Sequence, residues 1–223
     1  MNFQRNIEIN DELQKLYEEN SAELIKLWSN HFKSKAFPKI GTFGIVDPEN
    51  YDTDNGILFI AKETRGEVTD FLLWLNTMAT KFETLEDKDR TKHPQIWYNI
   101  GRWAKFINNP KIDKKMLLAE KQTALEGLKT IAFTNINKVY GKSSSQKEFW
   151  KLANVPIVQT VLQREIETIS PRIIVLCGNG LRDTLKNIKT DAIIIEMPHP
   201  SARCSKEKML NQLESQLKGC DIL

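Results

Sequence analysis

A histidine between two prolines is the clearest candidate for chemistry in this chain. It lies in the segment Met197-Pro198-His199-Pro200-Ser201-Ala202-Arg203, directly after the apolar run 192–195. Because proline fixes its own φ angle and disfavours a helical conformation in the residue before it, His199 is expected in a fixed, extended backbone. Its imidazole could act on a substrate, or it could only hydrogen-bond nearby groups in a rigid turn.

Two further polar residues follow apolar runs in the same way. Glu63 follows the run 57–60, and Asn135 follows the run 131–134. A carboxylate can orient a water and stabilise a cationic sugar while a glycosidic bond breaks, and a histidine can stabilise the departing base. An asparagine can read the edge of a pyrimidine with one donor and one acceptor. Each also has a structural alternative: Glu63 could pair with Lys62 or Arg65, and Asn135 could cap a turn.

Four short apolar runs, each followed or preceded by a helical pattern, predict how these residues are positioned. The runs are 57–60, 131–134, 173–176 and 192–195. Their alternation with helices predicts a three-layer α/β/α sandwich with a central, mostly parallel, four-stranded sheet. Ligands bind beyond the carboxyl ends of such strands, so Glu63, Asn135 and His199 are expected to meet at one edge.

The remaining pattern predicts one domain over residues 1–223, with residues 1–50 outside the core that carries the motifs. Helices are expected at 9–28 with Asn10 as N-cap, 68–78, 96–107, 116–128, 155–169 and 181–188, and around the stripe of Met209, Leu210, Leu213 and Leu217. The proline- and glycine-containing stretch 38–48 and the polar stretch 84–92 are expected to be loops, and the stretch 138–151 is polar and basic.

Composition excludes several classes of protein. With 40% hydrophobic and 27% charged residues, the 223-residue chain is typical of a soluble globular domain. No apolar run is long enough to span a membrane and the N-terminus has no signal-peptide pattern, so a cytoplasmic protein is expected. The net charge of +3 is too small to indicate a polyanionic partner without local basic patches.

No cofactor is expected from the sequence. The three cysteines, Cys177, Cys204 and Cys220, form no CxxC pair, which argues against a zinc site or a four-cysteine iron–sulfur cluster. No GxGxxG or Walker motif follows the first apolar run, which argues against a different α/β enzyme that acts on a small nucleotide.

Taken together, these segments resemble the uracil-DNA glycosylase superfamily. Residues 57–63 resemble its strand that leads to the acidic, water-activating position, and residues 133–138 resemble its strand that ends in the base-reading asparagine. Residues 170–178 resemble its helix-to-strand segment, and residues 199–201 match its HPS motif, whose histidine stabilises the leaving base. The resemblance extends from about residue 56 to residue 217.

The resemblance implies a monomeric DNA glycosylase that hydrolyses the N-glycosidic bond of a flipped, deaminated base, uracil or a similar one, in double- or single-stranded DNA. The implied catalytic residues are Glu63 and His199. The implied base-binding residues are Ala61, Lys62, Asn135 and Phe71, although Phe71 also fits a helix core. The implied DNA contacts are Ser201, Arg203, Lys138, Lys142 and Lys147. Thr64-Arg65-Gly66 replaces the proline and aromatic residue of the uracil-specific branch, so the selected base stays open.

Two other functions are compatible with the same residues. A non-catalytic module on this fold would bind a nucleic acid or a nucleotide without releasing a base. A different α/β enzyme would prefer free nucleosides to DNA. Turnover on DNA separates the three alternatives.

Overall fold

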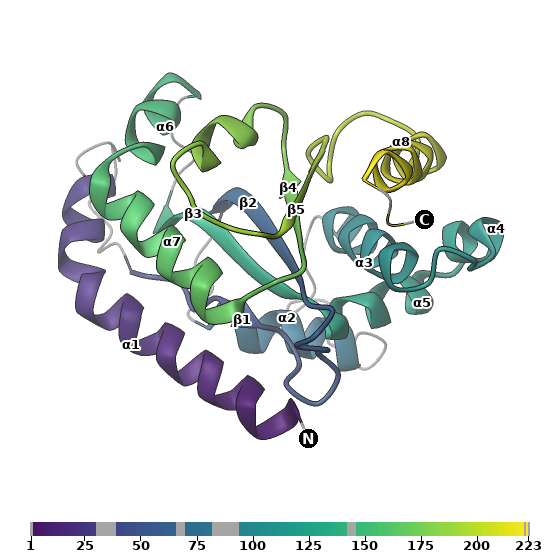
Figure 1. Ribbon diagram of the computed structural model, residues 1–223, viewed down its shortest axis with the longest axis horizontal. Helices are drawn as coiled ribbons and strands as arrows, with labels where there is room; N and C mark the ends of the chain where they lie inside the picture. Colours follow the sequence, from purple (N-terminus) through teal and green to yellow (C-terminus); the bar gives the residue numbers. More distant parts are fainter. Residues whose placement is uncertain are drawn as a thin grey trace.

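Five strands form one mixed sheet in the order β1-β3-β2-β4-β5 (Figure 1). The computed structural model describes residues 2–29, 39–65, 70–81, 94–141, 146–220 and 222. The strands are β1 (Gly44–Ile45), β2 (Ile57–Arg65), β3 (Ala132–Gly141), β4 (Ile173–Cys177) and β5 (Ile193–Met197). Strands β2 to β5 are mutually parallel, and β1 runs antiparallel to β3.

Helices lie on both faces of this sheet (Figure 1). Helices α1 (Asn2–Ser29) and α7 (Pro156–Ile169) pack together on one face, while α2 (Phe71–Lys81), α3 (Pro94–Asn108) and α5 (Lys121–Glu126) cover the other. The remaining helical elements are α4 (Lys114–Ala119), α6 (Gln146–Ala153) and α8 (Lys206–Gly219), and the short 3₁₀ turns η2 (Gly127–Thr130) and η3 (Leu181–Leu185). The predicted α/β class is confirmed, and the arrangement agrees with the predicted layering.

The predicted strand number is wrong, because β1 lies in the stretch 38–48 that was expected to be irregular. This two-residue strand has no apolar pattern of its own, and its outer edge is paired by a side chain. Asn10 Nδ2 donates to Ile45 O (3.0 Å) and Asn10 Oδ1 accepts from Ile45 N (2.8 Å). Asn10 lies inside α1, which begins at Asn2, and is not its N-cap as expected. A side chain at Gly44, whose φ is +146°, would overlap Asn10 Oδ1.

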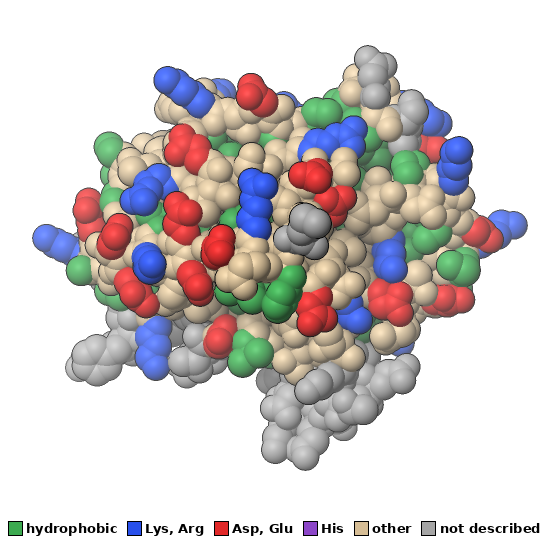
Figure 2. Space-filling model, turned by 60° about the horizontal axis from the view of Figure 1, so that its bottom comes forward, with side chains coloured by type: hydrophobic (Ala, Val, Ile, Leu, Met, Phe, Trp, Pro, Cys, Tyr) green, Lys and Arg blue, Asp and Glu red, His purple; other side chains and the backbone are tan. Residues whose placement is uncertain are grey.

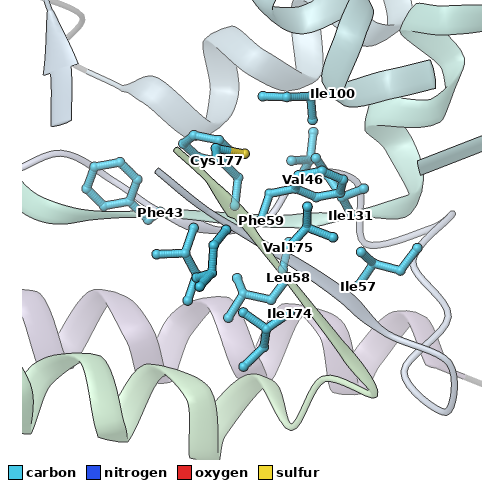
Figure 3. Close-up of a cluster of buried hydrophobic side chains, with 14 of the residues drawn as sticks. Phe43, Val46, Ile57, Leu58, Phe59, Ile100, Ile131, Ile174, Val175 and Cys177 are labelled. Atoms are coloured by element: carbon cyan, nitrogen blue, oxygen red, sulfur yellow. The ribbon is translucent and has the colours of Figure 1, made fainter. Parts of the chain in front are cut away.

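The core extends through both layers of helices and includes the N-terminal helix. Leu58 and Ile174 point toward α1 and α7, whereas Ile100 of α3 approaches the opposite face of the sheet (Figure 3). Leu13 and Trp28 of α1 belong to the same buried cluster as the sheet residues. Helix α1 thus packs into the same hydrophobic core as the strands that carry the motifs.

Several predicted helices are shorter or interrupted. The expected helix 116–128 is divided into α4, α5 and η2, since Glu120 between α4 and α5 has an extended backbone (φ −91°, ψ 116°). The Leu117 carbonyl, which a continuing helix would pair with residue 121, accepts from Arg102 Nε (3.0 Å) instead. The expected helix 181–188 is the short turn η3. The polar stretch 138–151 contains the end of β3 and α6. Within the described part of the chain, no helix is both long and apolar enough to cross a membrane.

Candidate active site at the carboxyl edge of the sheet

The register of β2 and β3 brings two of the predicted residues to the same face of the sheet. Ala61 is paired with Asn135, and Glu63 is paired with Asn137. Side chains alternate along a strand, so Ala61, Glu63 and Asn135 share one face. Phe133 lies on that face and contacts rings of α2 and α3, so this is the face that α2 and α3 cover.

The third residue, His199, reaches the same edge from β5. Met197 ends β5 and is paired with Cys177 at the end of β4, and β4 lies directly beside β2. His199 lies two residues after Met197, just as Glu63 lies two residues after Ala61. One strand separates β2 from β5, so their backbones lie about 10 Å apart. The topology therefore gathers a carboxylate, a carboxamide and an imidazole at the carboxyl edge, as predicted.

The Glu63 carboxylate is nearly buried and has a cationic neighbour. Its side chain is 8% exposed, and its Oε1 lies 3.8 Å from Lys62 Nζ. The Lys62 ammonium also lies 4.6 Å from the centre of the Phe149 ring in α6. The sequence allowed an ion pair between Glu63 and Lys62 as a structural alternative, and this ion pair is present. The Lys62 ammonium therefore lies between Glu63 and α6.

Hydrogen bonds of the local backbone determine the tautomer of His199. Ser201 N lies 3.1 Å from His199 Nδ1, and Ser201 Oγ lies 2.7 Å from the same atom. A backbone N–H can only donate, so Nδ1 accepts and the proton of a neutral imidazole is on Nε2. The exposed ring of His199 therefore carries an Nε2–H donor at the edge of the sheet.

Asn135 is buried, and its backbone is held by Lys138. The Lys138 Nζ donates to the Asn135 carbonyl, to Thr134 Oγ1 (2.6 Å) and to Glu165 Oε2 (2.6 Å). Thr134 Oγ1 and the Tyr17 hydroxyl both donate to Glu165 Oε1. This network joins α1, α7 and β3 directly behind Asn135.

The prediction that Lys138 contacts DNA is wrong. Its side chain is 2% exposed and forms an ion pair with Glu165, which is fully buried. Burial lowers the pKa of Lys138, while the neighbouring Glu165 carboxylate acts in the opposite direction. A phosphate could not reach this ammonium without opening the layer between β3 and α7.

The other predicted site residues have different surroundings. Phe71 is 3% exposed and packs against the rings of Phe43, Trp74, Trp97 and Phe133, which favours the helix-core interpretation over a stacking platform. Ser201 and Arg203 are exposed beside His199. Lys142 lies outside the described residues, as does the side chain of Lys147.

Two features beside the site were not predicted from the sequence. A pocket of about 650 Å³ lies between α3, Leu118 of α4 and the start of α8, and it borders Ser201. In its wall, the buried Asn99 donates to Pro200 O (2.7 Å) and so contacts the histidine segment. Asn99 lies 101 positions before Pro200, so no local pattern relates the two.

The charged groups elsewhere in the described part of the chain can be compared with a metal site and, on one face, with a basic binding surface. Among the described residues, no three His, Cys, Asp or Glu side chains cluster closely enough to hold a metal ion. On the face shown in Figure 2, acidic and basic side chains are interspersed, so this face is not a continuous basic surface.

The end of β4 carries Cys177, whose thiol pKa is raised by burial.

Comparisons with protein-family models and with curated protein sequences find no match for this chain.

Proposed function

We propose that this protein is a DNA glycosylase that hydrolyses the N-glycosidic bond of a flipped, deaminated base. One observation supports this proposal above the others. The carboxylate of Glu63, the carboxamide of Asn135 and a histidine with an oriented Nε2–H donor lie at the carboxyl ends of β2, β3 and β5, on the same edge of the sheet. These are the three groups that base reading, water activation and stabilisation of the leaving base require.

In this proposal each group has one role in the reaction. Glu63 orients a water toward C1′ of the sugar, stabilises the positive charge that develops there and accepts the proton of the attacking water. The bond between C1′ and the base nitrogen breaks, and its electron pair remains on the base. His199 Nε2–H donates a hydrogen bond to the base oxygen where this charge develops, and Asn135 holds the base edge. The released base then takes a proton from solvent.

Replacing Glu63 with glutamine is expected to lower the rate of base release by about 10²-fold or more, because an amide cannot accept the proton of the water. DNA affinity and the folding midpoint should change little, since glutamine keeps the shape of the side chain. The measurement is the appearance of abasic sites in oligonucleotides that carry uracil, hypoxanthine, xanthine or a mismatch.

Glu126→Gln is the matched control for this experiment. Glu126 also forms an ion pair with a lysine, Lys105, at 3.2 Å, but it lies in α5 and outside the proposed site. The control should release base at the wild-type rate. A Glu63→Gln protein that is as active as the control would remove Glu63 from the mechanism.

Exposed cations next to His199 are expected to contact the DNA backbone. Arg203→Ala should weaken DNA binding without sequence preference and should lower the slope of log K against log salt by roughly 0.7–0.9, the value of one phosphate contact. Arg172→Ala is the control, because Arg172 is also exposed but precedes β4 at the amino edge of the sheet. If both variants keep the wild-type slope, Arg203 belongs to the solvated surface.

A non-catalytic nucleic-acid-binding module is the second candidate, and the Lys62–Glu63 ion pair favours it. A carboxylate that is already paired has less capacity to act on a water. Such a module would bind the same oligonucleotides with salt-dependent affinity but would leave no abasic sites, even at enzyme excess and long incubation.

A further inference from the structure

We propose that Asn99 is a positioning residue, which orients His199 through the peptide bond between Pro200 and Ser201. Asn99 lies in α3, outside the sheet edge and outside every motif of the sequence. The inference rests on the proposed function, because it concerns the same histidine.

The hydrogen bonds of Asn99 fix the orientation of its amide. Asn99 is 4% exposed, and its Nδ2 donates to Pro200 O (2.7 Å). Its Oδ1 accepts from Arg102 Nη1 (3.2 Å) and from Gln95 Nε2 (2.9 Å). Arginine has no acceptor, so the oxygen of the amide must face Arg102 and the NH₂ group must face Pro200.

The guanidinium that holds this amide is itself held in place. Arg102 is 1% exposed, and its Nε donates to Leu117 O (3.0 Å) at the end of α4. Pro200, at the other end of the contact, is buried as well. The amide of Asn99 is therefore held between two buried groups.

The planarity of the peptide bond transmits this restraint to the histidine. Pro200 C=O and Ser201 N–H belong to one peptide unit, and in a trans peptide they point in opposite directions. Asn99 holds the carbonyl, and the N–H on the other side points to His199 Nδ1 at 3.1 Å. Fixing the carbonyl therefore fixes the donor that selects the Nε2–H tautomer of His199.

Asn99→Asp tests the inference with a change of almost no volume. One carboxylate oxygen keeps its contact with Arg102, now as an ion pair, so the fold is expected to be retained. The other oxygen replaces the donor that faces Pro200 O and repels that carbonyl. The 200–201 peptide should then rotate, and His199 Nδ1 should lose its N–H partner.

Two readouts follow the histidine directly. The side-chain nitrogen shifts of His199, assigned among the three histidines with a His199→Gln protein, should change from one Nε2–H tautomer to a mixture. Exchange of the Ser201 amide should accelerate about 10-fold, the effect of losing one ordinary hydrogen bond. Base release in single turnover should slow by about 10- to 10²-fold, with DNA affinity within about 2-fold of wild type, as expected for a misplaced group.

Asn108→Asp is the matched control. Asn108 lies on the same helix and also donates through its amide, to Thr130 Oγ1 (2.9 Å), but it is exposed and has no contact with the histidine segment. It should leave all three readouts unchanged. If Asn99→Asp does not fold, Asn99→Ser, which cannot reach Pro200 O, replaces it.

The inference is wrong if His199 keeps the Nε2–H tautomer in the Asn99 variants and the Ser201 amide still exchanges at the wild-type rate. The nitrogen shifts and the amide exchange do not depend on turnover. If the wild-type protein releases no base from any oligonucleotide, the proposed function fails, while these two measurements still decide whether Asn99 positions His199.

Discussion

Replacing His199 with alanine is expected to slow base release by about 10²- to 10³-fold, the effect of removing one preorganised donor from an oxyanion site. DNA binding should change little, because the donor interacts most strongly as charge develops on the departing base and so lowers the barrier rather than the binding energy. Single-turnover rates at saturating enzyme measure the chemical step, and the anisotropy of a labelled oligonucleotide measures binding.

A pair of polar substitutions separates the two nitrogens of this histidine. Asparagine places an acceptor near the position of Nδ1, so His199→Asn can keep the hydrogen bond from Ser201 N while it lacks the distal donor. Glutamine reaches the position of Nε2 with an N–H group. His199→Gln should therefore recover part of the rate that alanine loses, whereas His199→Asn should not.

The alternative roles of His199 give different results in the same series. If the asparagine variant restores the rate, the residue acts through the turn with Ser201 and not as a donor. If the variants bind DNA poorly but release base at the normal rate once bound, His199 positions the substrate. If only the melting temperature falls, the segment is a rigid turn, and the binding-module function becomes the better proposal.

The parts of the fold that depend on local pattern could be predicted from the sequence. Each of the four apolar runs lies in a strand to within one residue, because a buried parallel strand needs continuous apolar residues on both faces. The stripe of the last helix, such as Met209 and Leu213, is buried as expected. Strand β1 could not be predicted, since Gly44–Ile45 is a strand only because β3 and Asn10 provide its partners.

The candidate site was predicted where it depends on strand ends and not where it depends on distant partners. The shared edge of Glu63, Asn135 and His199 follows from the parallel order of the strands. The contact between Asn99 and Pro200 joins residues 101 positions apart, and no local pattern predicts it. The burial of Lys138 had a signal that can be recognised in retrospect. Its partner Glu165 occupies a position of the apolar stripe of α7, between Leu162 and Ile166, where a carboxylate is buried and needs a cation.

Among the residues that the sequence predicted for the site, Lys138 is expected to lower stability most when it is replaced. Methionine at this position keeps the length of the side chain but leaves the fully buried Glu165 carboxylate without its cation. Breaking one member of a buried ion pair costs about 3–5 kcal/mol in the free energy of unfolding. Tyr17 and Thr134 still donate to Glu165, but they are neutral and cannot replace the positive charge.

Urea unfolding of wild type and three variants measures this effect as a change in the free energy of unfolding. Lys105→Met breaks the partly exposed pair with Glu126 and should cost less than about 1 kcal/mol. The double variant Lys138→Met with Glu165→Met removes both charges and should recover most of the stability that Lys138→Met loses. Equal losses for Lys138→Met and Lys105→Met would contradict a buried, structurally essential pair.

DNA binding by Lys138→Met provides an independent check of the same hydrogen-bond network. Because Lys138 also donates to the Asn135 carbonyl, the same variant should loosen the end of β3 that carries Asn135. Under the proposed role of Asn135, the affinity of this variant for oligonucleotides that carry uracil should then fall. This affinity is measured without urea, where the fold is intact.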